Sequence, residues 1–480
     1  MPAVLTHSDQ VDTVAQLAAR PNEALAHWVR ISGASYSRIA AEVGRVAARH
    51  GRHDIQPDSS RVSRWINKGE RPRHPAPAFL AEAMSILCHG RTLTPADLGL
   101  TSAGPPPWGG DAWSARTVVA AILDTTRSDA VTDDRIPSPA RPLSGAALVN
   151  AVQPWLHLHN LEPLPAPEQP GPRLGRSDVA RIEATTDAFR ELDNTHGGGL
   201  SRLAVVGQLQ HVTHLTRTGT YTEETGRELF VAVAELASVA GWMTHDAGAH
   251  ADAQTYLLLG LQAARQAGRD GAGIGGHLMN CLARQANHLG RPDDALDLVQ
   301  AAQYGTRKLH SGRLRALLCS LEARSHAALG HIEEMTRATG AAEQALADED
   351  TTMTPGWAAW FDLAEFRVTA GVCEFEAAEH APGRIGNAIN LIAQGTTDRP
   401  SDRVRSRAFD QIALARAYVR ADEPEAASTA TAAALNLMGT ITSTRVGDRL
   451  RELDIELGTA PKVAATADSR ASIRAALQPL

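Results

Sequence analysis

Cations gather between residues 61 and 73, where the segment RVSRWINKGERPR holds five Lys or Arg residues and a single Glu. An Arg guanidinium carries its N–H donors in a planar fork, which matches the oxygens of a phosphate or the O6 and N7 atoms of guanine. Serine hydroxyls can bond to bases or to phosphates. These residue types therefore suit contact with DNA. The structural alternative is a basic helix that is only solvated.

The elements that would position these side chains begin with a short helix at about residues 60–68. Val62, Trp65 and Ile66 recur at i, i+3 and i+4, which predicts one apolar face. Asp58 and the serines after it are suitable N-cap residues, and Gly69 is a suitable residue to end the helix. The candidate DNA-binding residues in and next to this helix are Ser59, Ser60, Arg61, Ser63, Arg64 and Lys68.

A second helix is predicted upstream, from about Ser35 to His50. Its expected buried stripe consists of Ile39, Ala40, Val43, Val46 and Ala47. Tyr36, Ser37 and Arg38 stand at its start, where we expect them to meet the DNA backbone. Arg71 and Arg73 follow the recognition helix and are expected to contact phosphates, which position a protein without carrying sequence information. The two helices together predict a helix-turn-helix.

The net charge is unevenly distributed along the chain. The whole sequence has 47 Lys and Arg against 54 Asp and Glu, a net charge of −7. Residues 30–91 hold eleven cations and five anions, or +6, so the remainder carries −13. A generally basic, histone-like protein is excluded, whereas a basic DNA-binding module in an acidic chain is not.

The pattern of helices, prolines and turns predicts an all-α protein with four regions. We expect a helix-turn-helix domain at 22–100 and a linker at 101–172, where twelve of the 26 prolines lie. Short helices are expected in the linker near 114–124 and 145–156. A TPR-like α-solenoid is expected at 173–457, followed by a frayed C-terminal tail at 458–480.

A weak internal repeat supports the solenoid. Leu282–Gly290, Leu321–Gly330 and Leu414–Ala421 are each rich in small residues, and each precedes a short polar turn. The turn glycines Gly248, Gly290 and Gly330 are 42 and 40 residues apart. Helical hairpins with a period near 40 are typical of TPR-type arrays with long helices.

Other patterns in the sequence do not predict a catalytic site or a cofactor site. The four cysteines are far apart and predict buried, reduced thiols in a cytoplasmic protein. Gly271–Gly276 matches GxGxxG as text but lacks a preceding strand, so these glycines are interpreted as an inter-helix turn. His211 and His214, like His245 and His250, lack the pattern of a metal site. We expect no metal, no cofactor and no enzymatic activity.

A ligand groove is a further hypothesis. Between Gly276 and Gly290, the residues Asn280, Arg284 and Asn287 fall at i, i+4 and i+7, opposite an apolar face. Asn amides suit the backbone of an extended peptide, and solenoids bind such ligands on their concave side. A solvent-exposed polar face is the alternative, since every amphipathic helix has one. The Trp242/Tyr256 and Trp357/Trp360 pairs are interpreted as packing between helices.

The sequence resembles a family of actinobacterial, Streptomyces-type transcriptional regulators. The resemblance lies in SSRVSRWINKGERPRHPAPAFLAEAMSILCHGRTLTPADLGL and, further on, in ATTDAFRELDNTHGGGLSRL, GRELFVAVAELASVAGWMTHDAGAHADAQTYLLLGLQAAR and LEARSHAALG. It implies an N-terminal XRE-like helix-turn-helix and a C-terminal TPR-like domain, and a role in antibiotic production or development. Unlike the XRE-like class, this chain has additional residues after Gly44, which are expected to lengthen the first helix and the following loop.

The sequence therefore predicts a sequence-specific transcriptional regulator that binds double-stranded promoter or operator DNA. A homodimer is expected, and a small molecule or peptide is the expected class of effector. The alternative is a TPR-type adaptor that binds proteins and has only weak, non-specific affinity for DNA. No stretch approaches the ~18 apolar residues of a membrane span, so the expected location is the cytoplasm, with DNA-bound molecules at the nucleoid.

Overall fold

The computed structural model consists of helices and short connections. It describes residues 21–70, 72, 76–88, 93, 95, 97–100, 113–131, 141–157, 171–196, 201–349, 354–438, 443–459 and 464–477. Over these ranges the chain is all-α, as predicted, and their β-type pairing is confined to an isolated bridge between Arg173 and Thr220. Contacts divide the chain into an N-terminal unit, Met1–Pro107 with Val131–Pro139, and a C-terminal unit, Trp108–Ala130 with Ala140–Leu480.

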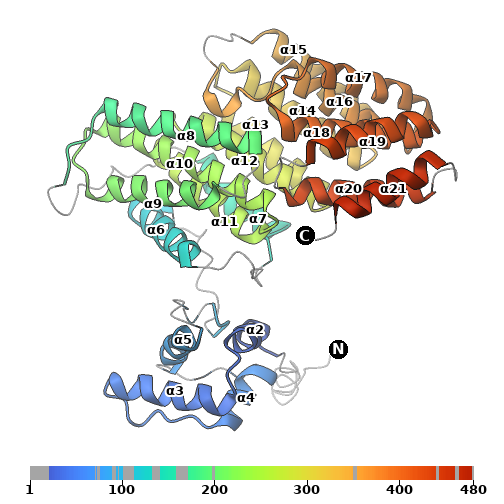
Figure 1. Ribbon diagram of the computed structural model, residues 1–480. Coiled ribbons are helices and arrows are strands. Elements are labelled where there is room, and N and C mark those ends of the chain that lie inside the picture. Colours follow the sequence, from blue (N-terminus) through green and yellow to red (C-terminus); the bar gives the residue numbers. More distant parts are fainter. Residues whose placement is uncertain are drawn as a thin grey trace, which may run out of the picture. The chain divides into compact units, whose positions relative to one another are not determined.

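The N-terminal unit packs its described helices around one apolar core (Figure 1). The helices are α2 (Glu23–Ser32), α3 (Tyr36–Arg49), α4 (Ser59–Asn67) and α5 (Ala76–Leu87). Helix α3 contacts both α4 and α5, and α2 contacts the same two helices. The apolar stripes predicted for α3 and α4 are confirmed, because all of their residues are buried: Ile39, Ala40, Val43, Val46, Ala47, Val62, Trp65 and Ile66.

The ends of α3 and α4 follow from their capping residues. The Ser35 hydroxyl accepts a hydrogen bond from the backbone N–H of Arg38 at 3.3 Å, and the Asp58 carboxylate accepts one from Arg61 at 2.7 Å. Gly69, just beyond α4, has φ +61°, a conformation that costs glycine least. The connection between α3 and α4 spans residues 50–58.

The C-terminal unit is a succession of helices in which neighbours along the chain pack together. They are α6 (Ala115–Val131), α7 (Ala146–Val152), the 3₁₀ helix η2 (Gln153–Leu156), α8 (Arg176–His196), α9 (Arg202–Thr218), α10 (Glu223–Asp246), α11 (His250–Gln266), α12 (Ala272–His288), α13 (Pro292–Thr306), α14 (Gly312–Ala328), α15 (Ile332–Ala347), η4 (Gly356–Ala358), α16 (Leu363–Ala377), η5 (Pro382–Arg384), α17 (Ile385–Asp398), α18 (Val404–Arg420), α19 (Pro424–Met438), α20 (Thr444–Thr459) and α21 (Ala464–Ala476). We call α8–α21 the helical array.

Two kinds of contact build the helical array (Figure 1). Each of the pairs α10–α11, α12–α13, α14–α15, α16–α17 and α18–α19 packs along its length. The even-numbered helices from α10 to α20 also contact one another in succession, and α18 contacts α8 near the start of the array. The even-numbered helices therefore form an inner layer that returns toward its own beginning.

The glycine turns predicted from the repeat are confirmed. Gly248, Gly290 and Gly330 follow α10, α12 and α14, and their φ angles are +87°, +71° and +75°. Glycine reaches these angles without the steric cost of a Cβ. The equivalent position after α18 is occupied by Asp422, which has φ +60°.

The linker and the C-terminal tail differ from the sequence-based predictions. Much of the predicted linker belongs to the C-terminal core, because Trp113, Ile122 and Trp155 are buried in it. The predicted frayed tail contains α21, which packs on α19 and α20 and buries Ile473. Both regions have polar flanks and low hydrophobicity, so the sequence pattern did not predict these tertiary contacts.

The glycine-rich segment 271–276 is also not an inter-helix turn. Gly271 is the N-cap of α12, and the later glycines lie inside that helix. A Cβ on Gly275 would lie 2.2 Å from Nε1 of Trp155, so the glycine permits close packing of the indole on α12. The four cysteines are free and buried, as predicted. Among the helices in the described ranges, none has both the length and the hydropathy that a membrane crossing requires.

Candidate functional sites

The exposed face of α4 carries the cations and serines that the sequence singled out. Ser59, Ser60, Arg61, Arg64 and Lys68 are exposed, and Ser63 is half-buried. Val62, Trp65 and Ile66 on the opposite face anchor α4 to the core of the N-terminal unit. Because the apolar side is fixed by packing, the polar side is presented to solvent on a rigid element.

Two of the α4 side chains already have partners. Nε of Arg64 lies 3.4 Å from a carboxylate oxygen of Glu70, and both side chains are about half exposed. The Ser63 hydroxyl accepts a hydrogen bond from the Asn67 amide at 3.1 Å. Exposed ion pairs contribute little free energy, typically about 0–1 kcal/mol, so the Arg64 guanidinium can exchange Glu70 for another anion at small cost.

The other cations of this surface differ from Arg64 in their surroundings. Arg38, Arg61 and Lys68 make no ion pair with any residue in the described ranges. By contrast, Arg52 in the α3–α4 connection donates two hydrogen bonds to Asp54, at 2.8 and 2.7 Å, and these bonds lower the pKa of Asp54 to about 2. Arg52 is therefore internally neutralised, whereas Arg38 and Arg61 are not.

The start of α3 supplies the second part of the predicted DNA-binding surface. Ser37 and Arg38 are exposed and Tyr36 is half-buried, with its ring against the core. These residues lie in the first turn of α3, whose backbone N–H groups point away from the helix. Arg71 and Arg73 were also predicted to contact phosphates, and both lie outside the described residues.

A second candidate site is a cavity of about 440 Å³ in the C-terminal unit. Its walls are the inner-layer helices α8, α10, α12, α14, α16, α18 and α20, together with the segment around η4. A smaller cavity of about 70 Å³ shares part of this lining. The residues common to both are Arg284, Arg324, Trp360, Glu365, Thr369, Arg445 and Arg449.

All three residues of the predicted ligand groove line the smaller cavity. They are Asn280, Arg284 and Asn287 on α12. Asn280 is 0% exposed, so the alternative of a solvent-exposed polar face does not apply to it. Neither the amide nitrogen nor the oxygen of Asn280 has a hydrogen-bond partner in the structure.

Tryptophans that the sequence assigned to packing also line the larger cavity. The Arg284 guanidinium lies 4.9 Å from the ring centre of Trp242 and 4.7 Å from that of Trp360. Tyr256 does pack between helices, and its hydroxyl donates a hydrogen bond to Asp129 at 2.6 Å. Sequence reasoning missed the cavity-facing indoles because an aromatic residue on a buried helix face gives the same pattern whether it meets a helix or a cavity.

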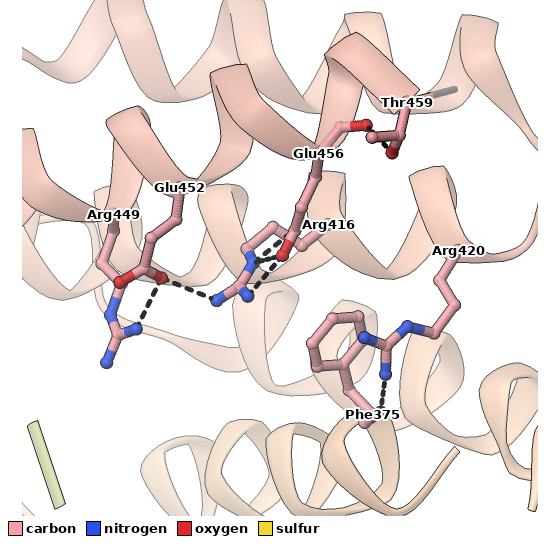
Figure 2. A network of polar contacts seen from close by, with 7 residues as sticks. All are labelled: Phe375, Arg416, Arg420, Arg449, Glu452, Glu456 and Thr459. Carbon is pink, nitrogen blue, oxygen red and sulfur yellow. Dashed lines mark hydrogen bonds and ion pairs between the residues drawn. The ribbon is translucent and has the colours of Figure 1, made fainter. Parts of the chain in front are cut away.

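At one end of the larger cavity, arginines and glutamates alternate. Figure 2 shows Arg416 held between Glu456 and Glu452, at 2.6 and 3.2 Å, with Arg449 on the far side of Glu452 at 2.6 Å. The Arg420 guanidinium carbon lies 4.0 Å from the centre of the Phe375 ring. These contacts join α16, α18 and α20, and they satisfy the charge of Arg416 within the protein.

Buried ion pairs close the helical array where α18 meets its first helices. Arg405 donates two hydrogen bonds to Asp193 on α8, at 2.9 and 2.6 Å, and one to Asp246 on α10 at 3.4 Å. Removing one partner of a buried ion pair leaves the other charge unpaired, which typically lowers the stability of the fold by about 3–5 kcal/mol. This triad therefore fixes the return of the inner layer and the shape of the cavity.

Three histidines meet beside the smaller cavity. His245, His250 and His288 come from the ends of α10, α11 and α12, and one ring nitrogen from each lies within 4.8 Å of the others. His288 was not singled out in the sequence, because its helix gives no spacing signal with the other two. Burial and the charge of Arg445 and Arg449 lower the pKa of His288 to about 3. The three rings also pack on one another, with ring centres 4.9–5.6 Å apart.

Comparison with known proteins finds one family. Residues 25–101 match the family model described as the SP15 N-terminal domain. No curated protein and no solved structure matches the chain. The match coincides with the helices of the N-terminal unit and does not extend to the helical array.

Proposed function

We propose that the protein is a sequence-specific DNA-binding transcriptional regulator. The observation that carries this proposal is the outer face of α4, where Ser60, Arg61 and Arg64 are exposed on a helix whose opposite face is anchored in a core. In this proposal α3 and α4 are the two helices of a helix-turn-helix, and α4 lies in the major groove. An Arg there can bind guanine through two parallel hydrogen bonds.

The charge balance supports the same proposal. Among the described residues, the cations of α4 and of the start of α3 have no acidic partner or, like Arg64, pair with an exposed acid. A phosphate can therefore replace water or Glu70 around them without breaking a buried interaction. The rest of the chain is acidic and repels DNA, which confines binding to the N-terminal unit.

We further propose that the helical array is a TPR-like α-solenoid that forms the dimer and binds an effector. A single DNA-binding module of this size buries about 600–1,000 Å² on DNA, which limits both its affinity and the number of bases read. Two modules in one dimer on a palindromic operator increase both. The mass of the protein in solution, measured by light scattering, tests the dimer directly.

The test of DNA binding starts from the fragments that the protein occupies in cells, mapped genome-wide. We expect a shared sequence in these fragments, and tight binding of one of them by the purified protein. Replacing Arg61 and Arg64 together by Ala should abolish this binding. Arg52→Ala is the matched control, because Arg52 is already neutralised by Asp54, and it should bind almost as the natural protein does.

The rival function is a protein-interaction adaptor with weak, non-specific affinity for DNA. It predicts no shared sequence among the occupied fragments, and similar losses from removing any exposed arginine. Sensitivity to salt does not separate the two functions, because phosphate contacts cause it in both.

A further inference from the structure

We propose that the junction of the two cavities binds an anionic ligand through a carboxylate or phosphate group. This inference rests on the proposed effector-binding role of the helical array and names the chemical class of the effector. The junction lies between α12, α14, α16 and α20, and its central residues are Arg284, Arg324, Arg445 and Asn280.

The first observation is an excess of cations. Four arginines line the smaller cavity, against one glutamate. That glutamate, Glu365, accepts a hydrogen bond at 2.8 Å from Arg399, which lies outside the smaller cavity. Among the residues that the structure describes, neither Arg284 nor Arg324 forms an ion pair.

The remaining carboxylates near the junction do not compensate these charges fully. Asp246 lies 3.4 Å from Arg445 but is shared with Arg405, and Glu452 serves both Arg449 and Arg416. Glu376 lines the larger cavity, but its Oε2 atom has no hydrogen-bond partner, and burial raises its pKa. The junction is therefore a half-buried region whose positive charge is not fully paired by the described residues.

The second observation is that aromatic rings hold two of the guanidinium groups in place. The Arg284 guanidinium lies 4.9 Å from the ring centre of Trp242 and 4.7 Å from that of Trp360, and the Arg445 guanidinium lies 4.9 Å from that of Trp242 and 5.0 Å from that of Phe409. Stacking uses the face of a guanidinium and leaves the N–H donors at its edge available. The donors are thus oriented before a ligand arrives, which lowers the entropic cost of binding.

The third observation is a set of buried polar atoms without partners. Both side-chain polar atoms of Asn280, the Oδ1 atom of Asn287 and the Nε atom of Arg445 are buried and make no hydrogen bond. Each such group costs about 1–3 kcal/mol when it is left unsatisfied. A ligand anion would accept from Asn280 and the arginines, and an adjacent O–H or N–H on the ligand would donate to Asn280 and Asn287.

The ionisation of neighbouring groups agrees with this assignment. The pKa of Arg284 is lowered by burial, and that of Arg445 is lowered to about 10 by burial and by the arginines around it. A bound anion would relieve both effects. The volume of the larger cavity falls within the range of about 300–1,000 Å³ that is usual for small-molecule sites, so the ligand is a molecule larger than a single ion.

The test is calorimetric titration of the full-length protein, without DNA, at constant ionic strength. The probes are phenyl phosphate, benzoate and, as a neutral control of the same shape, benzamide. We expect saturable binding of at least one anion and none of benzamide. Binding of phenyl phosphate alone would identify the ligand group as a phosphate, and binding of benzoate alone as a carboxylate.

Two variants locate the binding, and a third controls for loss of charge. Arg324→Gln should weaken the anion about tenfold or more. Asn280→Asp should abolish binding while the protein stays folded, because the new carboxylate occupies the position of the ligand. Arg227→Gln is the control, since Arg227 is on α10 outside both cavities and pairs with Glu223 and Asp270.

The proposal is overturned if no anion binds saturably, if benzamide binds as well as benzoate, or if both junction variants bind the anion as the control does. Because this titration contains no DNA, its outcome is independent of whether the N-terminal unit recognises an operator.

Discussion

At the scale of single residues, the same side chain serves different roles according to what surrounds it. Arginine supplies nearly all of the cations in this chain. Arg61 is exposed and makes no ion pair with any described residue, Arg405 is held by two buried aspartates, and the half-buried Arg284 packs against two tryptophans. The first arrangement suits a phosphate or a base, the second holds helices together, and the third suits a ligand anion.

Arg64 provides a test of how DNA is read. If its guanidinium binds a guanine, Arg64→Ala should cost about 1–3 kcal/mol on the specific site and little on random DNA. Fluorescence anisotropy with both DNAs measures the two losses. Equal losses on both would show instead that Arg64 contacts a phosphate.

His277 makes stability depend on pH. Burial, with smaller effects of Arg190 and Arg284, lowers the pKa of His277 to about 3 in the folded protein, whereas an unfolded histidine titrates near its ordinary pKa. The unfolded state therefore takes up the proton first, and stability falls as the pH drops below about 6.5. Lowering the pH from about 7.5 to 5 should reduce the free energy of unfolding by about 2 kcal/mol through the titration of this residue.

Urea unfolding of the natural protein and of His277→Gln across this pH range measures the effect. The difference in stability between the two proteins should shift in favour of the variant as the pH falls. A difference that stays constant with pH would contradict the buried, neutral state of His277.

At the scale of elements, the turns after the inner helices show how the repeat is encoded. Asp422 adopts φ +60° at the position where the turns after α10, α12 and α14 have glycine. Asp422→Gly should therefore raise the free energy of unfolding by about 0.5 kcal/mol, since glycine removes the strain but also gains freedom in the unfolded chain. The reverse change, Gly290→Asp, meets no atom within 4 Å but keeps φ +71°, and it should destabilise by about 1 kcal/mol. Chemical denaturation measures the change in the free energy of unfolding for both variants. Changes of the same sign would show that the positive φ angle does not decide the stability of these turns.

Helix α12 depends on a close approach that only glycine allows. Gly275→Ala would place a Cβ 2.2 Å from Nε1 of Trp155, so the indole must shift, at a cost of about 1–3 kcal/mol. Gly340→Ala on α15 meets nothing within 4 Å and should stabilise by up to about 1 kcal/mol through helix propensity. Thermal unfolding compares the two. A Gly275→Ala protein as stable as the natural one would mean that Trp155 does not pack there.

These elements also show what the sequence could predict. Helix α4 was predicted to within a residue, because its cap at Asp58, its stop at Gly69 and its apolar stripe are all local signals. The place of Trp155 against α12 and the helical tail were not predicted, because they depend on contacts between residues far apart in the chain. For the same reason the sequence grouped Asn280, Arg284 and Asn287, which share one helix, but missed Arg324 and Arg445, which reach the cavity from α14 and α20.

At the scale of the whole molecule, the net charge is unevenly divided. Residues 30–91 carry +6 and the remainder of the chain carries −13, so in the proposed function DNA is attracted to the first region and repelled by the second. Inside that acidic array, the cavity junction is locally cationic. If both proposals hold, the small anion and DNA bind to different units of the chain and should not compete with each other.

Whether the N-terminal unit recognises a DNA sequence, as we propose, can be decided by a competition assay. The full-length protein is bound to a labelled DNA fragment that it occupies in cells, and unlabelled DNA of the same or of random sequence is added at a fixed salt concentration. We expect the occupied sequence to compete about 10³-fold or more better than random DNA. Equal competition by the two DNAs would contradict it.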